Sequence, residues 1–399
     1  MELGFISIMP HPTGPARAST QNDVYSVRGG VVVAEGKTMR SINQHLIAER
    51  LKISRSTVSR CFTNHPGINP KTRAKVFALA SKMGYSHPEK RVVATKGRAT
   101  VKRLAFGVLI CVDLPNFEQT AYGNPGQELL NGLSELARAN HVRLDLHFVR
   151  PEDLHLNGPS YAKIFSGRRR QWDGVVLIYP FPKTVVDELM ARYPVVSLVE
   201  QYGTTPLNCV DVDHHRGISR LVERLHSLGH RKIGFFTWRY GVEASWALRR
   251  FSAFVERMTA LGLPIDARDI INVGPHGGVD APVAHARVAE RTRAGVTAWL
   301  CAADHQVFEL IPYLQSQGLA VPGDVSIAGF DGLASPVTLP AITTIEIPYH
   351  HIGVIGGKRL LDLVNKRFDA SQHILLDCEL RAGETIGPVP TASAIAARA

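Results

Sequence analysis

A short polar segment carries side chains whose types could read the edges of DNA bases. Arg55, Ser56 and Arg60 project from one predicted helix in this segment. An arginine can donate hydrogen bonds to O6 and N7 of the same guanine, and such a contact discriminates against other bases by about 1 to 3 kcal/mol. The residue types therefore suit sequence readout, provided that the surrounding elements present them to a groove.

Charged and aromatic side chains also stand where several predicted strands end or the following helices begin. They are Glu200, Trp238, Arg250, Asp304, His305 and Asp331. In open parallel sheets, ligands bind beyond the carboxyl ends of the strands, so these positions indicate a small-molecule site. Two alternatives stay open: Asp304 is also suited to capping a helix, and Trp238 and Trp246 could belong to the core.

The charge of the chain is concentrated in one segment. The 399 residues carry a formal charge of +11. From Lys37 to Arg103 there are sixteen Lys and Arg against Glu49 and Glu89, a net charge of +14. Each Lys or Arg that neutralises a phosphate releases a counterion, so such a block favours binding to nucleic acid. Because apolar residues recur in it at helical spacing, we expect a folded domain instead of a solvated tail.

Three helices are predicted in this basic segment. The first spans residues 41–50, and Ser54 is placed to cap a second over residues 55–62. Asn69 and Pro70 are start signals for a third helix. The inward-facing apolar residues are Ile42, Leu46, Ile47, Val58, Phe62, Val76, Leu79, Ala80 and Met83. Two helices joined by a tight turn, the second short and basic, are typical of domains that enter the major groove.

The run SRSTVSRCFTNHPGINPKTRAKVFALASKMGY resembles the headpiece of the lactose-repressor (LacI/GalR) family of transcription regulators, including its TVSR and KTR motifs and the closing GY. The resemblance implies that Arg55 and Ser56 contact base edges and that Arg60 contacts guanine or the DNA backbone. Phosphate contacts, which position a protein on DNA without specifying sequence, are expected from Thr57, Ser59, Asn64 and Thr72.

The headpiece departs from the family pattern at two places. Lys52 stands where the turn between the first two helices usually has glycine, so a left-handed backbone there must be tolerated. The linker HPEKRVVATKGRAT has Ala94 or Thr95 where the family carries a leucine that wedges into the minor groove. Both a hinge helix and an extended basic linker with phosphate contacts stay open.

The chain after Arg103 alternates strand-like runs with amphipathic helices, which predicts parallel strands with crossover helices. LGHRKIGF, ALRRFSAF and VPGDVSIAGFDG are similar to the core domain of the same family. That resemblance implies two doubly wound α/β subdomains like those of a periplasmic sugar-binding protein. It also implies that Glu200, Arg250 and Asp331 bind sugar hydroxyls. Ala303 replaces a frequent asparagine, so a different hydroxyl pattern or a non-sugar effector is plausible.

Other chemistry finds little support. The five cysteines are scattered without a CxxC pair, as expected of reduced thiols in a core. His214 and His215 follow Asp211 and Asp213, and the cap and first turn of a helix explain them better than a metal site. The run GVIGGK lacks the spacing of a phosphate-binding loop and suggests close helix packing. We expect no cofactor, no metal and no enzymatic activity.

The sequence predicts a cytoplasmic, DNA-binding transcription regulator, with an all-α helix-turn-helix headpiece and an α/β periplasmic-binding-protein-like core. The expected parts are an extension (1–37, disordered), a headpiece (38–86), a basic linker (87–103), a sensor domain (104–390) and a tail (391–399). The expected partners are operator DNA, a sugar-like effector and a second copy of the chain. Repression is favoured over activation, and a solute-binding protein is the weaker alternative because no signal peptide precedes the basic segment.

Overall fold

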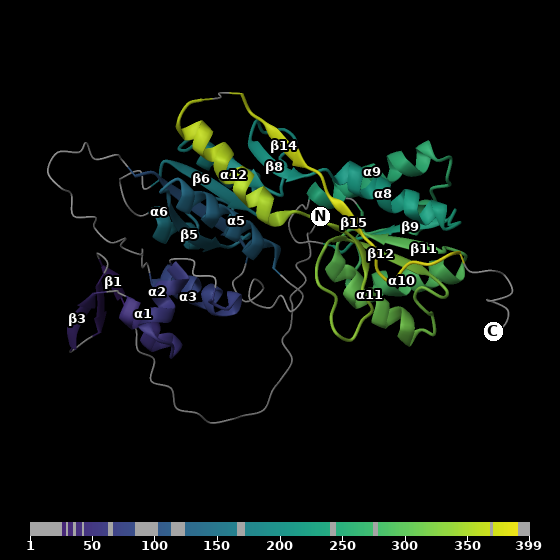
Figure 1. Cartoon of the computed structure of the whole chain (residues 1–399), viewed down its shortest axis with the longest axis horizontal. Helices are drawn as coiled ribbons and strands as arrows, with labels where there is room; N and C mark the ends of the chain where they lie inside the picture. The colour runs from purple at the N-terminus through teal and green to yellow at the C-terminus, as the bar shows by residue number, and fades with distance from the viewer. Residues whose placement is uncertain are drawn as a thin grey trace, which may run out of the picture.

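The computed structural model describes residues 26–28, 31–34, 37–41, 44–62, 67–83, 103–112, 124–165, 172–239, 245–273, 278–367 and 370–389. Two α/β lobes lie side by side, and a small helical unit lies beside the first (Figure 1). The parallel sheets and the helical N-terminal unit confirm the predicted fold class. No helix among these residues is long and apolar enough to span a lipid bilayer.

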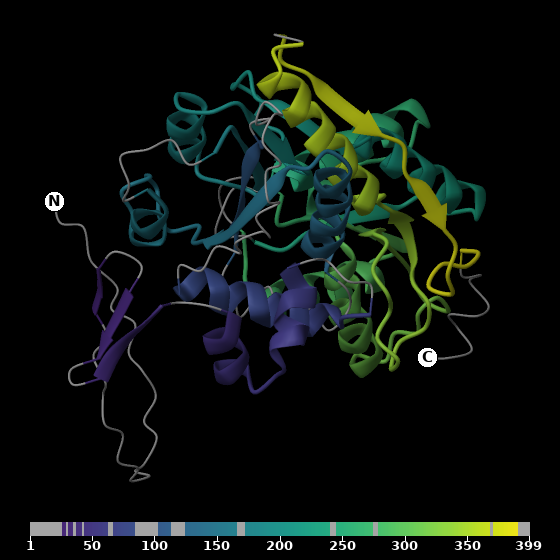
Figure 2. The same cartoon turned by 60° about the vertical axis from the view of Figure 1, so that its left-hand side comes forward.

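The helical unit contains α1 (Gln44–Leu51), α2 (Arg55–Phe62) and α3 (Pro70–Met83), which Figure 2 shows grouped together. Its core is made by Ile47, Ala48, Val58, Cys61, Val76, Ala80 and Met83. Lys52 adopts the left-handed conformation that the missing glycine required, with φ of 52°. The headpiece turn is therefore kept without glycine.

Three short strands precede the helices and correct two expectations. They are β1 (Ser26–Arg28), β2 (Val31–Ala34) and β3 (Lys37–Ser41), paired antiparallel. Disorder was expected over residues 1–37, but the strands occupy part of that range, where valines flank a Gly-Gly hairpin signal. The first helix begins at Gln44 instead of Ser41, because Ser41 pairs with Val31 in the sheet.

The first lobe is a six-stranded parallel sheet with helices. The strands, in spatial order, are β14 (His373–Leu376), β8 (Asn208–Val212), β7 (Val195–Leu198), β6 (Gly174–Ile178), β4 (Ala105–Cys111) and β5 (Arg143–Val149). The helices are α5 (Pro125–Ala139), α6 (Pro159–Phe165), α7 (Lys183–Met190) and α12 (Tyr349–Val364). The continuous apolar runs that form β4 and β6 are buried throughout, as expected of strands covered on both faces.

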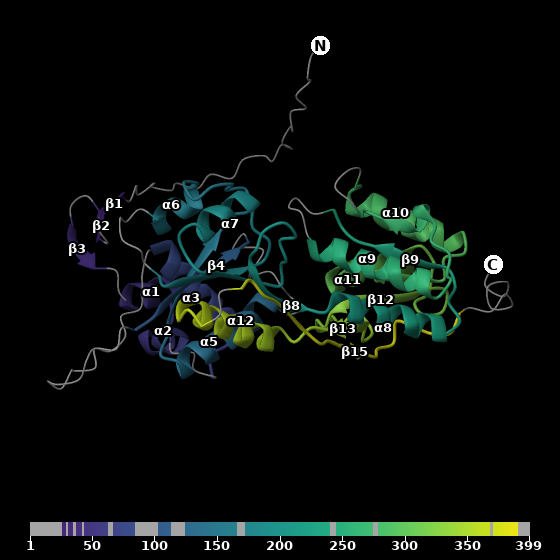
Figure 3. The same cartoon turned by 90° about the horizontal axis from the view of Figure 1, so that it is seen from above.

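The second lobe repeats this plan. Its strands, in spatial order, are β10 (Ile270–Ile271), β9 (Ile233–Phe236), β11 (Ala298–Cys301), β12 (Ser326–Asp331), β13 (Thr343–Glu346) and β15 (Glu379–Arg381). Its helices are α8 (His214–Ser227), α9 (Ser245–Ala260), α10 (Ala281–Arg293) and α11 (Asp304–Ser316), with the 3-10 turn η1 (Ala267–Asp269). Within the described strands of this sheet, β13 and β15 pair antiparallel and the other neighbours pair parallel. From above, α9 and α10 lie with this lobe, and α6 and α7 with the first (Figure 3).

The described chain passes between the lobes at three junctions, from β8 to α8, from β13 to α12 and from β14 to β15. Figure 1 shows the last of these as the yellow β14 and β15 running from one lobe to the other. The first and last junctions are joined, because the amide of Asp213 donates to the carbonyl of Leu376 at 2.9 Å. Neighbouring backbone crossings of this kind are where a two-lobed protein can bend.

Candidate nucleic-acid interface and ligand site

The polar face that the sequence predicts to meet DNA lies on α2. Val58 and Cys61 are buried, while Arg55, Ser56 and Arg60 are exposed. This division follows from the helical period, because the buried side chains share one face of the helix and Phe62 packs against the same core. The structure thus brings together the three side chains that were expected to face bases.

The start of α2 is fixed as the sequence predicted. Ser54 Oγ accepts a hydrogen bond from the amide of Thr57 at 3.0 Å, which confirms Ser54 as the cap. The same oxygen lies 2.7 Å from Ser56 Oγ and 2.8 Å from Thr57 Oγ1. The hydroxyls of Ser56 and Thr57 therefore gather at the helix start, which places them at the positive end of the helix dipole, where anions bind.

The other predicted phosphate contacts are spread over the unit. Ser59 and Thr72 are half-buried, on α2 and at the start of α3. Asn64, Gly84, Tyr85 and the predicted linker over residues 87–102 lie outside the described residues. Asn69 Oδ1 accepts from the amide of Lys71 at 2.9 Å, so the third helix begins as predicted.

Arg250 is the centre of the candidate ligand site. Its side chain is buried, and Nη1 donates to Asp331 Oδ1 at 3.0 Å and also to the carbonyl of Ala302. Its guanidinium lies 3.9 Å from the ring centroid of Phe330 and 4.7 Å from that of Trp246. Sequence placed Arg250 and Asp331 at one site, and the structure brings these two residues into contact.

Asp331 has a strained backbone, with φ of 144° in the range that favours glycine. Tyr349 OH, at the start of α12 in the first lobe, donates to Asp331 Oδ1 at 3.2 Å. Because Asp331 ends β12 of the second lobe, this hydrogen bond joins the two lobes. No sequence pattern points to Tyr349, since its contact with Asp331 depends on the tertiary fold.

Asp304 is fully buried, and its carboxylate does not cap α11, which corrects one alternative. Oδ2 accepts from the amide of Leu333 at 2.7 Å and Oδ1 from Thr344 Oγ1 at 2.6 Å. Ala303 is the capping residue, and its amide donates to Gln306 Oε1 at 3.2 Å. Burial, followed by repulsion from Asp331, raises the pKa of Asp304 well above its usual range.

Glu200 lies where the first lobe meets the second. Its side chain is buried, and Oε1 accepts a hydrogen bond from Ser245 Oγ, at the start of α9. The backbone carbonyl of Glu200 accepts from Ser197 Oγ at 2.7 Å, which fixes the loop after β7. Glu200 of the first lobe therefore contacts the start of α9, the helix of the second lobe that carries Arg250.

Trp238 and His305 form a pair apart from Arg250, with ring centroids 4.6 Å apart. Trp238 lines a cavity of about 440 Å³ with Arg239, Val279, Asp280, Ala281 and Glu309. Burial lowers the pKa of His305 and raises that of Glu309. Trp238 lines this cavity, is only partly buried and packs against the hydrophobic core of the second lobe.

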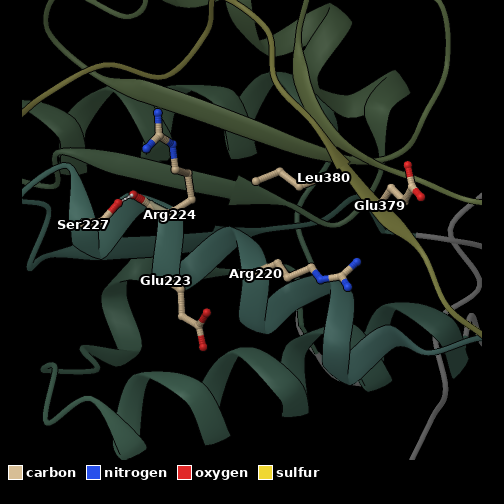
Figure 4. Close-up of a pocket in the computed structure, with 6 residues that line it drawn as sticks. All are labelled: Arg220, Glu223, Arg224, Ser227, Glu379 and Leu380. Carbon is tan, nitrogen blue, oxygen red and sulfur yellow. Dashed lines mark hydrogen bonds between the residues drawn. The ribbon is translucent and has the colours of Figure 1, made fainter.

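A second hollow, of about 480 Å³, lies elsewhere, between α8 and β15 (Figure 4). It is lined by Arg220, Glu223, Arg224, Ser227, Glu379 and Leu380. None of these is among the predicted ligand residues. Arg220 already contacts the carbonyl of Cys378 and, at 3.4 Å, the carboxylate of Asp377, so this arginine is part of the junction between β14 and β15.

His214 and Asp211 occupy the junction between β8 and α8. Asp213 caps α8 by accepting from the amide of Arg216 at 3.0 Å, and His214 and His215 form its first turn, as expected. The described residues contain no cluster of three or more His, Cys, Asp or Glu that could hold a metal ion. All five cysteines are buried free thiols.

Asp211 is an ionised carboxylate held by donors. Burial would raise its pKa, but contacts with His214, Gln201 and the amide of Val212 outweigh this and lower it. Gln201 Nε2 donates to Oδ2 at 2.9 Å, and the Val212 amide donates to Oδ1 at 2.8 Å. The sequence pattern of Asp211 and His214 suggests only a metal as ligand. The contact of His214 with Arg250 joins distant segments and leaves no local pattern in the sequence.

The chain joins a helix-turn-helix unit to a two-lobed domain that has buried polar groups at the lobe junctions. This combination defines a class of ligand-responsive DNA-binding proteins. The family model described as "Bacterial regulatory proteins, lacI family" matches residues 46–88, and that described as "Periplasmic binding protein-like domain" matches residues 222–386. The chain carries a DNA-binding domain of the LacI family of bacterial regulatory proteins together with a periplasmic-binding-protein-like domain.

Known proteins similar to this chain are regulators. The HTH-type transcriptional regulator Rv3575c of Mycobacterium tuberculosis is 26% identical over 86% of this chain and 96% of its own length. A lac repressor dimer bound to operator has a TM-score of 0.58 and 21% identity, over 87% of this chain and 100% of that chain. A regulator CelR–cellobiose complex has a TM-score of 0.57 and 18% identity, over 86% and 99%. These two structures share the fold, and the recognised relatives are regulators, not enzymes.

Proposed function

We propose that this protein is a sequence-specific DNA-binding repressor whose DNA affinity is controlled by a small-molecule effector. The observation that carries the DNA-binding part is α2, which is capped by Ser54 and presents Arg55, Ser56 and Arg60 away from its buried face. A short helix with a basic outer face fits the major groove. Arg55 and Ser56 read base edges, and Arg60 contacts guanine or the backbone.

The phosphate contacts come from Thr57, Ser59, Asn64 and Thr72. Exposed or half-buried positions for Thr57, Ser59 and Thr72 support this role. The basic segment supplies the salt-dependent affinity. Domain boundaries near residues 38–86 for the headpiece and 104–390 for the sensor domain are part of the proposal, as is a cytoplasmic location, where bacterial DNA is found.

The effector is a sugar or sugar derivative bound at the lobe junction. Glu200 from the first lobe and Arg250, Asp304 and Asp331 from the second supply carboxylates and a guanidinium, which are the groups that hydrogen-bond hydroxyls. The cavity beside Trp238 and His305 offers an aromatic face for a sugar ring. The cellobiose in the CelR complex supports a sugar, and Ala303 in place of an amide argues for a different hydroxyl pattern.

The protein acts as a homodimer. A dimer presents two headpieces to a pseudo-palindromic operator, and effector binding changes their spacing by moving the lobes at the three junctions. The effector must bind one arrangement of the lobes better than the other, because an equal affinity for both would shift nothing. The lac repressor dimer bound to operator supports this assembly.

Selection of duplexes from a random pool by the purified full-length protein tests the DNA-binding part. We expect an enriched two-fold motif whose binding weakens steeply with salt. A pool that stays random at moderate ionic strength would refute sequence-specific binding.

A thermal-shift screen of the same protein with cellobiose, glucose and sucrose tests the effector class. A ligand that binds the folded state raises the melting temperature by mass action. Binding must also change the affinity for the selected duplex. If none of the three sugars, nor sugar phosphates, moves either quantity, the sugar assignment is wrong.

A further inference from the structure

A chain of buried polar contacts crosses between the lobes at the candidate ligand site. Gln201 Nε2 donates to Asp211 Oδ2, His214 Nε2 lies 3.2 Å from the same oxygen, and Arg250 Nε donates to His214 Nδ1 at 3.2 Å. Arg250 Nη1 then donates to Asp331 Oδ1, which also accepts from Tyr349 OH. The chain thus starts in the first lobe, passes through the second and returns to the first at α12.

The chemistry of these partners fixes where the proton of His214 lies. A guanidinium has only donors, so His214 Nδ1 must accept from Arg250 Nε with its lone pair. The other ring nitrogen, Nε2, therefore carries the proton and donates it to the Asp211 carboxylate. A protonated imidazole would turn an N–H toward the N–H of Arg250 and break that contact.

Several groups bear on the charge of His214. Asp211 on β8 and Arg250 on α9 contact its ring, and the Phe330 ring on β12 packs 5.8 Å away. Behind Arg250 stand Asp331, Asp304 and Tyr349. Cys378, after β14, reaches the backbone of Asp213. The adjacent His215 does not join this group, because its ring pairs with Glu256 at 3.0 Å and is half-exposed.

We propose that Asp211 and His214 are positioning residues that hold the Arg250 guanidinium in its effector-binding orientation, with His214 neutral and protonated on Nε2. The inference rests on the proposed function in one respect, namely that Arg250 contacts the effector. Asp211 belongs to the first lobe and Arg250 to the second, so the pair also ties the orientation of Arg250 to the arrangement of the lobes. Without Asp211 and His214, the hydrogen-bond acceptors that remain for Arg250 are Asp331 and the Ala302 carbonyl.

Two substitutions test the contacts of the two ring nitrogens of His214 separately. In His214→Asn, the side-chain oxygen stands near the place of Nδ1 and still accepts from Arg250, while the contact with Asp211 is lost. In His214→Gln, the amide nitrogen stands near the place of Nε2 and still donates to Asp211, while the acceptor for Arg250 is lost. His215→Asn is the matched control, one residue away on the same helical turn.

The probes are cellobiose, glucose and sucrose, titrated by calorimetry into the full-length protein. For whichever sugar binds, we expect His214→Gln to lose about ten-fold or more in affinity and His214→Asn to lose about three-fold or less, with His215→Asn unchanged. Equal losses in both His214 variants would overturn the positioning role.

Nitrogen NMR of the unliganded full-length protein with labelled histidine decides the proton position without any effector. We expect the Nδ1 signal of His214 to be that of an unprotonated nitrogen and the Nε2 signal that of a protonated one at neutral pH. The reverse order, or a doubly protonated ring, would refute the pairing. If no sugar binds while the NMR result is as expected, the sugar assignment fails and the buried Asp211–His214–Arg250 pairing stands.

Discussion

At the scale of single residues, the polar groups of the ligand site are paired with one another before any ligand arrives. Arg250, Asp331, Asp304 and Glu200 each have a described hydrogen-bond partner, and several of these partners come from the opposite lobe. A buried charge is tolerated only when it is paired. An effector that binds these groups must therefore exchange hydrogen bonds with the protein's own partners, which couples ligand binding to the lobe junction.

Replacing Arg55 by alanine should relax base preference. The exposed guanidinium on α2 is proposed to donate to a guanine, so its loss should remove about 1 to 3 kcal/mol of discrimination at that position. Competition between the selected duplex and single-base variants measures this. Arg216→Ala on α8 removes the same charge from an exposed site far along the chain and should leave discrimination intact. Full discrimination in Arg55→Ala would contradict the assignment.

Replacing Arg250 by methionine should destabilise the fold, because it leaves Asp331 as a poorly solvated carboxylate without its cation. We expect a loss of about 3 kcal/mol in the free energy of unfolding. The double variant Arg250→Met, Asp331→Asn should recover part of that loss, since the uncompensated charge is removed as well. Urea unfolding followed by fluorescence measures both. Additive effects of the two substitutions would show that the pair is not coupled.

At the scale of elements, local signals identified the helices of the headpiece. Ser54 and Asn69 are caps whose hydrogen bonds are visible in the structure, and Lys52 takes the conformation that its position requires. These features depend on residues two or three apart, so sequence is enough to find them. The strands before Gln44 escaped prediction because short hairpins resemble loop sequence.

The close packing of α5 against α12 can be tested at this scale. A Cβ at Gly132 would overlap the carbonyl oxygen of His350, and one at Gly353 would overlap that of Leu129. Because both obstacles are backbone atoms, Gly132→Ala and Gly353→Ala should force the helices apart and cost about 1 to 3 kcal/mol each. Gly203→Ala, where a Cβ meets nothing within 4 Å, is the control. Thermal unfolding compares the melting temperatures of the three variants. Equal values for all three would contradict the predicted close packing of α5 against α12.

At the scale of the whole molecule, the sequence predicted a set of candidate ligand residues near strand ends but not how they connect. Glu200 follows β7 of the first lobe, while Asp331 ends β12 and Arg250 lies on α9 of the second, so the topology brings them to the lobe junction. The contacts of Asp211, His214, Ser245 and Tyr349 cross from one lobe to the other. Apart from the Asp211–His214 contact, which joins residues three apart, these contacts join segments far apart in the chain, and a single sequence holds no record of them.

Buried histidines distributed over both lobes make stability depend on pH. Burial lowers the pKa of His147, His230, His285 and His305 below the ordinary value. The folded protein therefore keeps them neutral, and the stability present above about pH 6.5, the unfolded value, is lost as the pH falls. Asp304 and Glu309 act in the opposite sense, because a raised pKa favours the folded state at low pH. Because the four histidines outnumber these two carboxyl groups, we expect a melting temperature that falls between about pH 7.5 and about pH 5.5.

His230 allows this prediction to be tested group by group. Its ring nitrogens Nδ1 and Nε2 each lie 2.9 Å from an oxygen, that of the Thr297 hydroxyl and that of the Gly387 carbonyl. Protonation must therefore occur at a ring that is already hydrogen-bonded on both sides. His230→Gln should lower stability at neutral pH and flatten the decline toward acid, because one buried proton acceptor is gone. His373→Gln, on the exposed start of β14, should leave the slope as it is. A wild-type melting temperature that is constant or rises toward acid would mean that the carboxylates outweigh the histidines.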